Sequence, residues 1–221
     1  MNATDSVNYK KGLESKKNIL YSAKKVLYER GYKRTTVDAI ARDAQVPASL
    51  VAYYFKKDEI LMTIHEDYVQ SILEAISEQV GNQLENNLQK HLLLAQIHTI
   101  GIYSDERNLN VFQHMIDHGV TSPKVKQTVD SYLLKLIDDF GLGLTDDEFE
   151  RMIVAQFGAH RELLRVYLKE YDPLVSRRLM YFAATISLRL AQLDHGILNA
   201  NIEKTDELLG KMDISGIRFL V

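Results

Sequence analysis

The fold of this chain is decided by residues 36–55, which read TVDAIARDAQVPASLVAYYF. Thr36 is a typical helix N-cap residue, and the apolar side chains that follow it recur at helical spacing (Val37, Ile40, Ala41 and Ala44). Gln45-Val46-Pro47 interrupts this pattern, and Pro47 suits the first turn of another short helix that ends near Tyr54. A short helix, a tight turn and a second short helix indicate a helix-turn-helix, whose second helix can enter the major groove of DNA.

The residues before this stretch predict one more helix. From Glu14 to Arg30 the apolar side chains (Ile19, Ala23, Val26 and Leu27) fall three and four residues apart, and Gly31 is expected to stop the helix. Residues 1–13 are polar and show no period, so we expect a flexible leader. Together these segments predict a three-helix DNA-binding domain over residues 1–57.

Residues 58–221 contain one helical pattern after another. Turn residues separate them near 81–82, 104–105, 119–123, 141–143 and 172–173. Ser122-Pro123 and Asp172-Pro173 are start signals, and Thr145 with Glu148 forms a capping-box pattern. The segments 146–170 and 173–195 are long and apolar, and one face of the second carries Leu179, Phe182, Ile186, Leu190 and Leu193. We therefore predict an all-α chain in which the N-terminal helix-turn-helix domain is followed by a larger helical domain.

Composition narrows the class of protein. Of the 221 residues, 46% are hydrophobic and 26% are charged, as in globular proteins, and the absence of cysteine excludes disulfides and cysteine-based metal sites. The longest apolar run, residues 179–188, is far shorter than the roughly 20 residues of a membrane-spanning helix. No secretory signal pattern is visible, so we expect a cytoplasmic protein without a membrane-bound part.

The charge is distributed unevenly. Residues 1–57 contain 12 Lys and Arg against 5 Asp and Glu, whereas the rest of the chain contains 15 against 25. A basic N-terminal part on an acidic body is typical of a module that binds a polyanion such as DNA. A merely solvated basic terminus is the alternative.

Three strings carry a resemblance to a known family. Residues 31–41 (GYKRTTVDAIA), 46–55 (VPASLVAYYF) and 58–61 (DEIL) closely resemble the N-terminal domain of the TetR family. The resemblance extends from about residue 16 to residue 64, and the remainder is similar to the family only in length and helical character. It implies a dimeric transcription regulator that binds an operator in double-stranded DNA and is not an enzyme. Consistent with this, the sequence has no nucleophile motif or phosphate-binding glycine loop.

The resemblance also implies a set of DNA contacts. The recognition helix would be residues 47–54, with base edges facing Ala48, Ser49, Leu50 and Ala52, and with phosphates near Thr36, Tyr53, Tyr54, Lys56 and Lys57. Packing against the first helix is the alternative for the two tyrosines. Ile40, Ala41, Val46, Val51 and Phe55 are interpreted as the core of the domain.

Three residues depart from the family pattern: Gln45 stands where the turn usually has glycine, Ala52 is small, and Asp58 replaces a frequent lysine. A left-handed backbone at Gln45 would be mildly strained. Because the recognition helix has few side chains that form bidentate bonds to bases, we expect specificity to rest on thymine methyl groups and DNA shape.

The resemblance assigns two roles to the rest of the chain. The segments 146–170 and 173–195 would form the homodimer interface, and helices within 84–170 would enclose a small-molecule ligand, with His98, His114 and His160 as polar contacts. His114 and His118 have the spacing of a two-ligand metal site, but hydrogen bonds between helices are the preferred interpretation, and we expect neither a metal nor a cofactor. The expected function is that of a repressor released by an inducer. A ligand-dependent activator, a DNA-bound interaction protein without an inducer, and a helical enzyme or carrier with a vestigial DNA-binding part are the alternatives.

Overall fold

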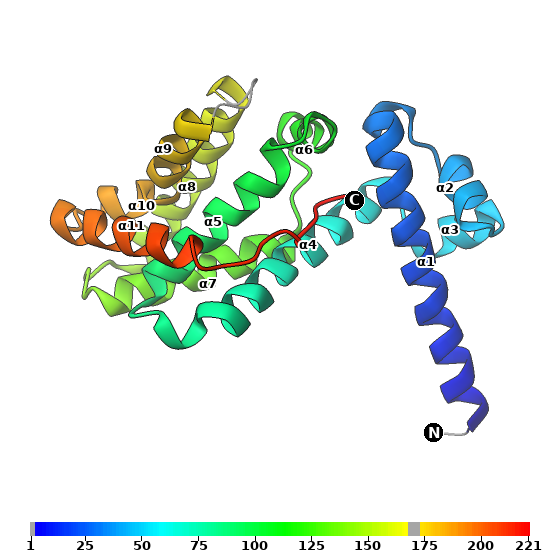
Figure 1. Cartoon of the computed structure of the whole chain (residues 1–221), viewed down its shortest axis with the longest axis horizontal. Helices are drawn as coiled ribbons and strands as arrows, with labels where there is room; N and C mark the ends of the chain where they lie inside the picture. Colours follow the sequence, from blue (N-terminus) through cyan, green and yellow to red (C-terminus); the bar gives the residue numbers. More distant parts are fainter. Residues whose placement is uncertain (1–2, 168–172) are drawn as a thin grey trace.

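The computed structural model describes the backbone of residues 3–167 and 173–221, and all of their regular secondary structure is helical. The elements are α1 (Ala3–Arg34), α2 (Val37–Ala44), α3 (Ala48–Tyr54), α4 (Lys57–Val80), the short 3₁₀ helix η1 (Gly81–Gln83), α5 (Asn87–Tyr103), α6 (Glu106–His118), α7 (Pro123–Asp139), α8 (Asp146–Tyr167), α9 (Pro173–Ala184), α10 (Ile186–Leu190) and α11 (His195–Leu209). The predicted all-α class is confirmed. Figure 1 shows α1–α3, here called the head, at one end of the molecule, and α4–α11, the body, at the other.

The head is a small helical cluster around α1. Ile19, Ala23 and Val26 on α1 are buried together with Ile40 on α2 and Val51 on α3. This apolar contact between helices far apart in sequence is the main stabilising force of so small a unit. The residues predicted to form the core of the head are therefore inside it, either buried or partly buried against the cluster.

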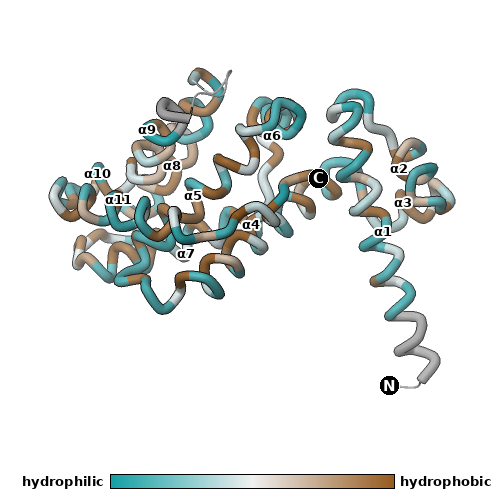
Figure 2. Tube along the Cα trace, in the orientation of Figure 1, coloured by the Kyte–Doolittle hydropathy of each residue, from teal (hydrophilic) through white to brown (hydrophobic). Residues whose placement is uncertain are grey.

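The first helix is longer than the sequence predicts. It starts at Ala3 instead of near Glu14, so the helix includes most of the segment that was expected to be a flexible leader. A helix that is already nucleated gains a hydrogen bond with each added residue, even where no apolar period marks it. The sequence over residues 3–13 is mostly polar, and the part of α1 next to the grey end in Figure 2 is largely hydrophilic. Hydrophobic periodicity therefore did not reveal this part of the helix. Gly31 breaks the helical geometry with φ 70°.

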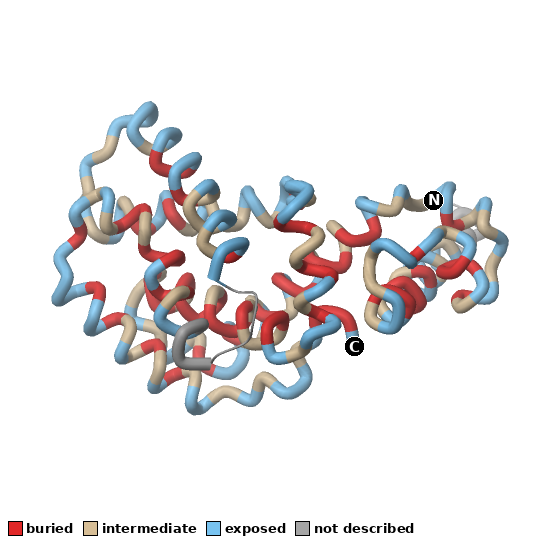
Figure 3. Tube along the Cα trace, turned by 90° about the horizontal axis from the view of Figure 1, so that it is seen from above, coloured by how far each residue is buried: buried red, intermediate tan, exposed pale blue. Residues whose placement is uncertain are grey.

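The body is built around α5. This helix is buried on most sides, and it packs against α4, α6, α7, α9 and α11. One buried cluster runs from the head into the body along α4, and a second one at the far end joins α5 and α7 to α8–α11. Figure 3 shows the buried residues following these central helices while the outer faces remain exposed.

The predicted helix 173–195 is divided in the structure. It breaks at Thr185, and Gln192 takes a positive φ of 60° before α11 begins. The Thr185 hydroxyl donates to the carbonyl of Tyr181 at 2.7 Å, which competes with regular helix bonding. The buried side-chain amide of Gln156 bonds the backbone on both sides of the break. It donates to the Ala183 carbonyl at 2.6 Å and accepts from the Ser187 N–H at 2.9 Å. The apolar period did not reveal this break because both flanking helices continue it.

Several predicted helix starts are confirmed. The Thr145 N–H donates to the carboxylate of Glu148, and the Thr145 side chain accepts from the Glu148 N–H, as in a capping box. Ser122 caps α7 ahead of Pro123. The expected start at Asp172 falls partly outside the described residues, while α9 begins at Pro173. None of the helices in the described ranges is both long and apolar enough to cross a bilayer.

Candidate DNA interface and its link to the body

The turn between α2 and α3 has the geometry that the sequence predicts. The side chain of Thr36 accepts the N–H of Ala39 at 3.1 Å and so caps α2. Gln45 ends α2 in the left-handed conformation, with φ 55° and ψ 42°. Pro47 is the residue before α3, not its first helical residue. The strained position expected for Gln45 is therefore present in the turn.

Two polar contacts hold α2 against α1. The amide of Asn18 donates to the carbonyl of Ala44 at 2.8 Å, and the ammonium group of Lys25 bonds the carboxylate of Asp43 at 2.7 Å. The first contact satisfies a carbonyl at the end of α2, which has no partner within its own helix. Sequence analysis missed both contacts, since nothing local links a residue on α1 to its partner some twenty residues later.

The outer side of α3 is open to solvent. Ser49 and Ala52 are exposed, Ala48 and Leu50 are half-buried, and Val51 faces the core. The helix thus presents the side chains that were expected to face base edges. Their contact with DNA remains a prediction.

The two tyrosines at the end of α3 have different surroundings. Tyr53 is 79% exposed, which leaves its hydroxyl free to approach a phosphate. Tyr54 is half-buried against α1, where the ammonium group of Lys16 lies 5.3 Å from the centre of its ring and its hydroxyl approaches Gly12. The two alternatives left open by the sequence therefore separate: Tyr53 has the surroundings of a DNA contact, and Tyr54 packs against α1.

The lysines after α3 also differ. Lys56 is exposed, and its backbone N–H donates to the Glu59 carboxylate at 2.8 Å. The ammonium group of Lys57 donates to the carbonyl of Tyr32 at 2.7 Å and lies 3.9 Å from the centre of the Tyr32 ring. Partial burial lowers the pKa of Lys57. The side chain of Lys57 is thus turned toward the end of α1.

Asp58, which departs from the family pattern, has a partner within the head. Its carboxylate accepts a hydrogen bond from the hydroxyl of Tyr32. Burial and this hydrogen bond raise the pKa of Tyr32 above its ordinary value. Asp58 therefore binds the hydroxyl of Tyr32, and Lys57 binds its backbone carbonyl. Both contacts lie at the junction of α1 and α4.

The family model of the bacterial regulatory proteins of the TetR family matches residues 19–62, which span the second half of α1, the whole of α2 and α3, and the start of α4. The matched residues include the helix-turn-helix of α2 and α3 described above. The N-terminal domain of this chain is therefore of the TetR type, and the chain is accordingly a DNA-binding transcription regulator.

Comparisons beyond the head are more distant. A gamma-butyrolactone receptor (ArpA-like protein) superposes with a TM-score of 0.47 at 12% sequence identity, covering 91% of this chain and 100% of that one. SCO7518 from Streptomyces coelicolor A3(2) superposes with a TM-score of 0.43 at 14% identity, covering 78% and 99%. No curated protein sequence matches this chain. The family assignment therefore rests on the N-terminal match.

Helix α6 connects the head to the rest of the body. The Tyr28 hydroxyl on α1 donates to the Asp105 carboxylate, the N-cap of α6, at 2.9 Å. The ring of His114 stacks on Tyr32 with centroids 3.6 Å apart. His114, expected to contact a ligand, thus lies at the junction with the head and is not brought together with His98 and His160.

Four histidines on α4, α5 and α8 lie inside the body. Nε2 of His98 on α5 is 2.8 Å from Nε2 of His65 on α4, so one ring donates this hydrogen bond to the other. Nε2 of His91 bonds the carbonyl of Ala184 at 3.0 Å, and Nε2 of His160 is buried with no partner among the described residues. Burial lowers the pKa of His65 and of His160 to about 4, and that of His98 well below its ordinary value. These rings are therefore neutral at pH 7. Sequence analysis missed His65 and His91, although both lie on helical apolar faces.

The described residues hold no group of three or more His, Cys, Asp and Glu side chains placed to bind a metal ion. His118, four residues after His114, has its Nδ1 3.0 Å from the His114 carbonyl oxygen. A partly open pocket of about 190 Å³ lies between α5, the start of α6 and residues 214–221. Its walls combine isoleucines (Ile97, Ile100, Ile214 and Ile217) with Asp105, Asn108 and Arg218.

Proposed function

We propose that this TetR-family regulator is a dimeric repressor that leaves its operator when a small molecule binds to the body. The observation that carries the DNA-binding part is the exposure of Ser49, Ala52 and Tyr53 on one side of α3, while Val51 on the other side is fixed in the core. A helix held in this way can insert its exposed side into the major groove without unfolding the head.

The DNA contacts that we propose follow from the surroundings of each side chain. The hydroxyl of Tyr53 and the ammonium group of Lys56 would contact phosphates, and Thr36 would offer its hydroxyl at the start of α2. Ala48, Ser49, Leu50 and Ala52 would face the bases. Tyr54 and Lys57 pack against α1 and its carbonyl end, so we assign them the indirect role of orienting α3 and α4.

The small side chains on α3 suggest how bases would be read. Ala48, Leu50 and Ala52 offer only methyl groups, and the thymine methyl is the apolar group that the major groove displays. We propose that methyl contact and the deformability of the site determine sequence preference.

A homodimer would double the DNA interface. Val154 on α8 is 73% exposed, and Phe182 on α9 and Leu190 on α10 are 47% and 59% exposed. These exposed apolar residues lie within the segments 146–170 and 173–195 that were expected to pair, of which residues 146–167 and 173–195 are described. A two-fold pair would present its recognition helices about 34–36 Å apart, one turn of DNA.

The inducer would act through the body. A ligand releases DNA only if it binds better to the conformation that does not fit the operator. His98 and His160 lie in the interior of the body, and α6 connects that body to α1 through Asp105 and Tyr28. Movement of α6 on ligand binding would therefore change the position of the head.

Selection of binding sites from a pool of random duplexes tests the DNA-binding proposal. We expect an enriched site with two similar halves, bound by the wild type and not by a variant with Ser49→Asp, which places a charge on the exposed side of α3. Replacing thymine by uracil in each half-site removes only the methyl group. Unchanged affinity after this replacement contradicts methyl reading, and a single half-site contradicts the dimer.

A further inference from the structure

Phe219 fills a box of aromatic rings inside the body. The side chain is completely buried, and the centre of its ring lies 6.1 Å from His65, 5.6 Å from Tyr68 and 6.2 Å from Phe112. The contacts with His65 and Phe112 are edge-to-face, the arrangement that aromatic pairs prefer. The box therefore accepts one aromatic ring, and it receives that ring from residue 219.

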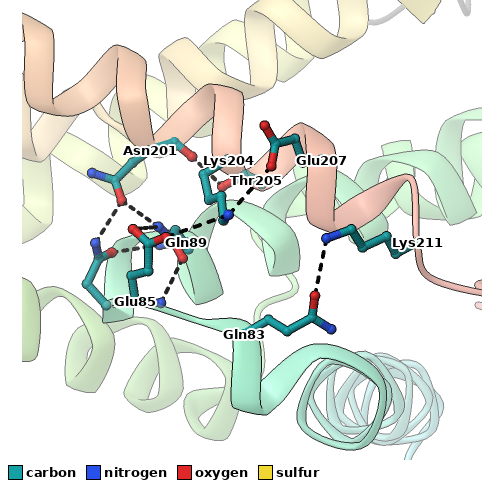
Figure 4. Close-up of polar contacts among 9 residues, drawn as sticks. Gln83, Glu85, Gln89, Asn201, Lys204, Thr205, Glu207 and Lys211 are labelled. Atoms are coloured by element: carbon teal, nitrogen blue, oxygen red, sulfur yellow. Dashed lines mark hydrogen bonds and ion pairs between the residues drawn. The ribbon is translucent and has the colours of Figure 1, made fainter.

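The ring is delivered by a non-helical segment, residues 212–221, here called the tail. The base of the tail is fixed. Figure 4 shows polar contacts between residues 83–89 and α11 with the turn that follows it. Gln89 donates to Asn201 on α11 at 3.1 Å, and Lys211 after α11 donates to Gln83 at 3.2 Å. The side-chain amide of Gln79 on α4 then donates a hydrogen bond to the backbone carbonyl of Asp213 and accepts one from its backbone N–H. From there the tail follows α4 toward the head, as Figure 1 shows.

Beyond Asp213 the tail buries Phe219 and Leu220, and it packs Ile214 and Ile217 partly against the core. The pocket of about 190 Å³ lies beneath this part, between the tail and α5. Gly101, which lines the pocket, adjoins the box, because a Cβ at this position would collide with the Tyr68 hydroxyl. Withdrawal of Phe219 breaks no helix and would join the box to an opening that already exists.

The hydrocarbon ring of Phe219 leaves buried polar atoms of the body without a hydrogen-bond partner. Nδ1 of His65 and the hydroxyl of Tyr103 are buried and have no hydrogen-bond partner among the described residues. Nε2 of His65 is already bonded to His98, and the Tyr103 ring packs on Phe112, 6.1 Å away. Buried polar groups without partners are rare in proteins and costly. A ring that carries a hydroxyl in place of Phe219 would offer the His65 Nδ1 a hydrogen-bond donor that phenylalanine lacks.

The box also lies against the two helices that connect the body to the DNA-binding head. His65 and Tyr68 belong to α4, which begins beside the recognition helix, and Phe112 belongs to α6, which is bonded to α1 through Asp105. Replacement of the Phe219 ring by a ligand between α4 and α6 would therefore act on both helices that connect the head to the body.

We propose that this box is a ligand-binding site occupied by the chain's own Phe219, and that its external ligand is a single aromatic ring bearing a hydroxyl group, of the phenol class. Such a ligand displaces Phe219 and frees the tail. The link from tail release to DNA release rests on the proposed repressor function, whereas the site itself does not.

Phenol and toluene test the site, since they have the same shape and differ by a hydroxyl against a methyl group. Calorimetry on Phe219→Ala should show phenol binding about ten-fold more tightly than toluene, because only phenol can donate a hydrogen bond to the unpaired Nδ1 of His65. Leu220→Ala removes the neighbouring buried side chain but leaves Phe219 in the box, so it is the matched control and should bind both probes more weakly than Phe219→Ala does. Equal binding of the two probes to Phe219→Ala, or binding of neither, overturns the proposal.

Tail release is measured in the wild type with trypsin. Arg218 is exposed, and docking of Phe219 protects the bond that follows it. We expect phenol to accelerate cleavage at Arg218 and toluene to have no effect, and we expect Phe219→Tyr, which keeps the ring, to slow the cleavage. Cleavage that phenol leaves unchanged overturns the proposal. If phenol frees the tail but DNA affinity stays the same, the site stands and the inducer function fails.

Discussion

The hydroxyl of Tyr28 on α1 donates a 2.9 Å hydrogen bond to the same carboxylate of Asp105 that caps α6. The other oxygen of Asp105 accepts the N–H groups of Arg107 at 2.8 Å and Asn108 at 3.1 Å. The guanidinium group of Arg107 lies 5.0 Å from the centre of the Tyr28 ring. One carboxylate thus begins a helix of the body and holds the first helix of the head, so a displacement of α6 acts directly on α1.

Removing the Tyr28 hydroxyl should loosen this connection. We expect Tyr28→Phe to lower the unfolding free energy only slightly, since one partly exposed hydrogen bond is lost. The larger effect should be on coupling, because head and body then move more independently. Titration of operator DNA with and without the inducer should show a smaller ligand-dependent change in affinity. Tyr21→Phe, at an exposed position of the same helix, is the control. Full coupling in Tyr28→Phe contradicts the role of this bond.

The turn residue Gln45 should be replaceable by glycine with a gain in stability. Its φ of 55° is costly for a side chain with a Cβ, while glycine adopts it freely but loses more entropy on folding. We expect Gln45→Gly to raise the unfolding free energy by about 0.5 kcal/mol in urea denaturation. Gln192→Gly, at φ 60° in the body, should behave similarly. A loss of stability in both variants would show that the glutamine side chains contribute contacts that outweigh the strain.

The buried histidines should make the protein sensitive to acid. The pKa values of His65 and His160 are lowered to about 4 in the folded protein, whereas unfolded histidine titrates near 6.5. The folded state therefore binds fewer protons, and stability is complete above pH 6.5 and is lost as the pH falls toward 4. At pH 5 each histidine should cost about 2 kcal/mol, which urea denaturation at pH 7.5 and 5 will measure. His160→Gln should weaken this pH dependence, and His195→Gln, an exposed control, should leave it unchanged.

A charge on the proposed dimer face should separate the protomers. Phe182 is 47% exposed on α9, and burying a charge there without a partner would be strongly unfavourable. We expect Phe182→Glu to sediment as a monomer while the wild type sediments as a dimer. Leu134→Glu alters a side chain of similar exposure on α7 and should remain dimeric. A dimer that survives Phe182→Glu places the interface elsewhere.

The parts of the structure that sequence analysis predicted are those encoded locally. The cap at Thr36, the turn at Gln45 and the capping box at Thr145 depend on residues within a few positions of one another, and all three are confirmed. The separation of Val51 from the exposed side of α3 follows from helical periodicity, so it could be predicted as well.

The remaining features depend on contacts between distant residues. The break at Thr185 is completed by Gln156 from α8, and the position of Lys57 is set by the carbonyl of Tyr32. Likewise, His98 is paired with a histidine 33 residues earlier, and His114 stacks on the head instead of facing the interior. No local pattern distinguishes these arrangements from their alternatives, because a histidine or lysine at helical spacing fits several of them equally well.

The central claim, that this protein binds DNA through α3, is tested most directly at Tyr53. Affinity for the selected site should be measured across salt concentrations for the wild type, Tyr53→Phe and Tyr53→Ala. We predict saturable binding that weakens with salt, as phosphate contacts require. Loss of the hydroxyl alone should weaken binding about five-fold, which corresponds to one hydrogen bond, and loss of the ring should weaken it further. Equal affinity of all three proteins, or no sequence-preferring binding at low salt, would contradict the account.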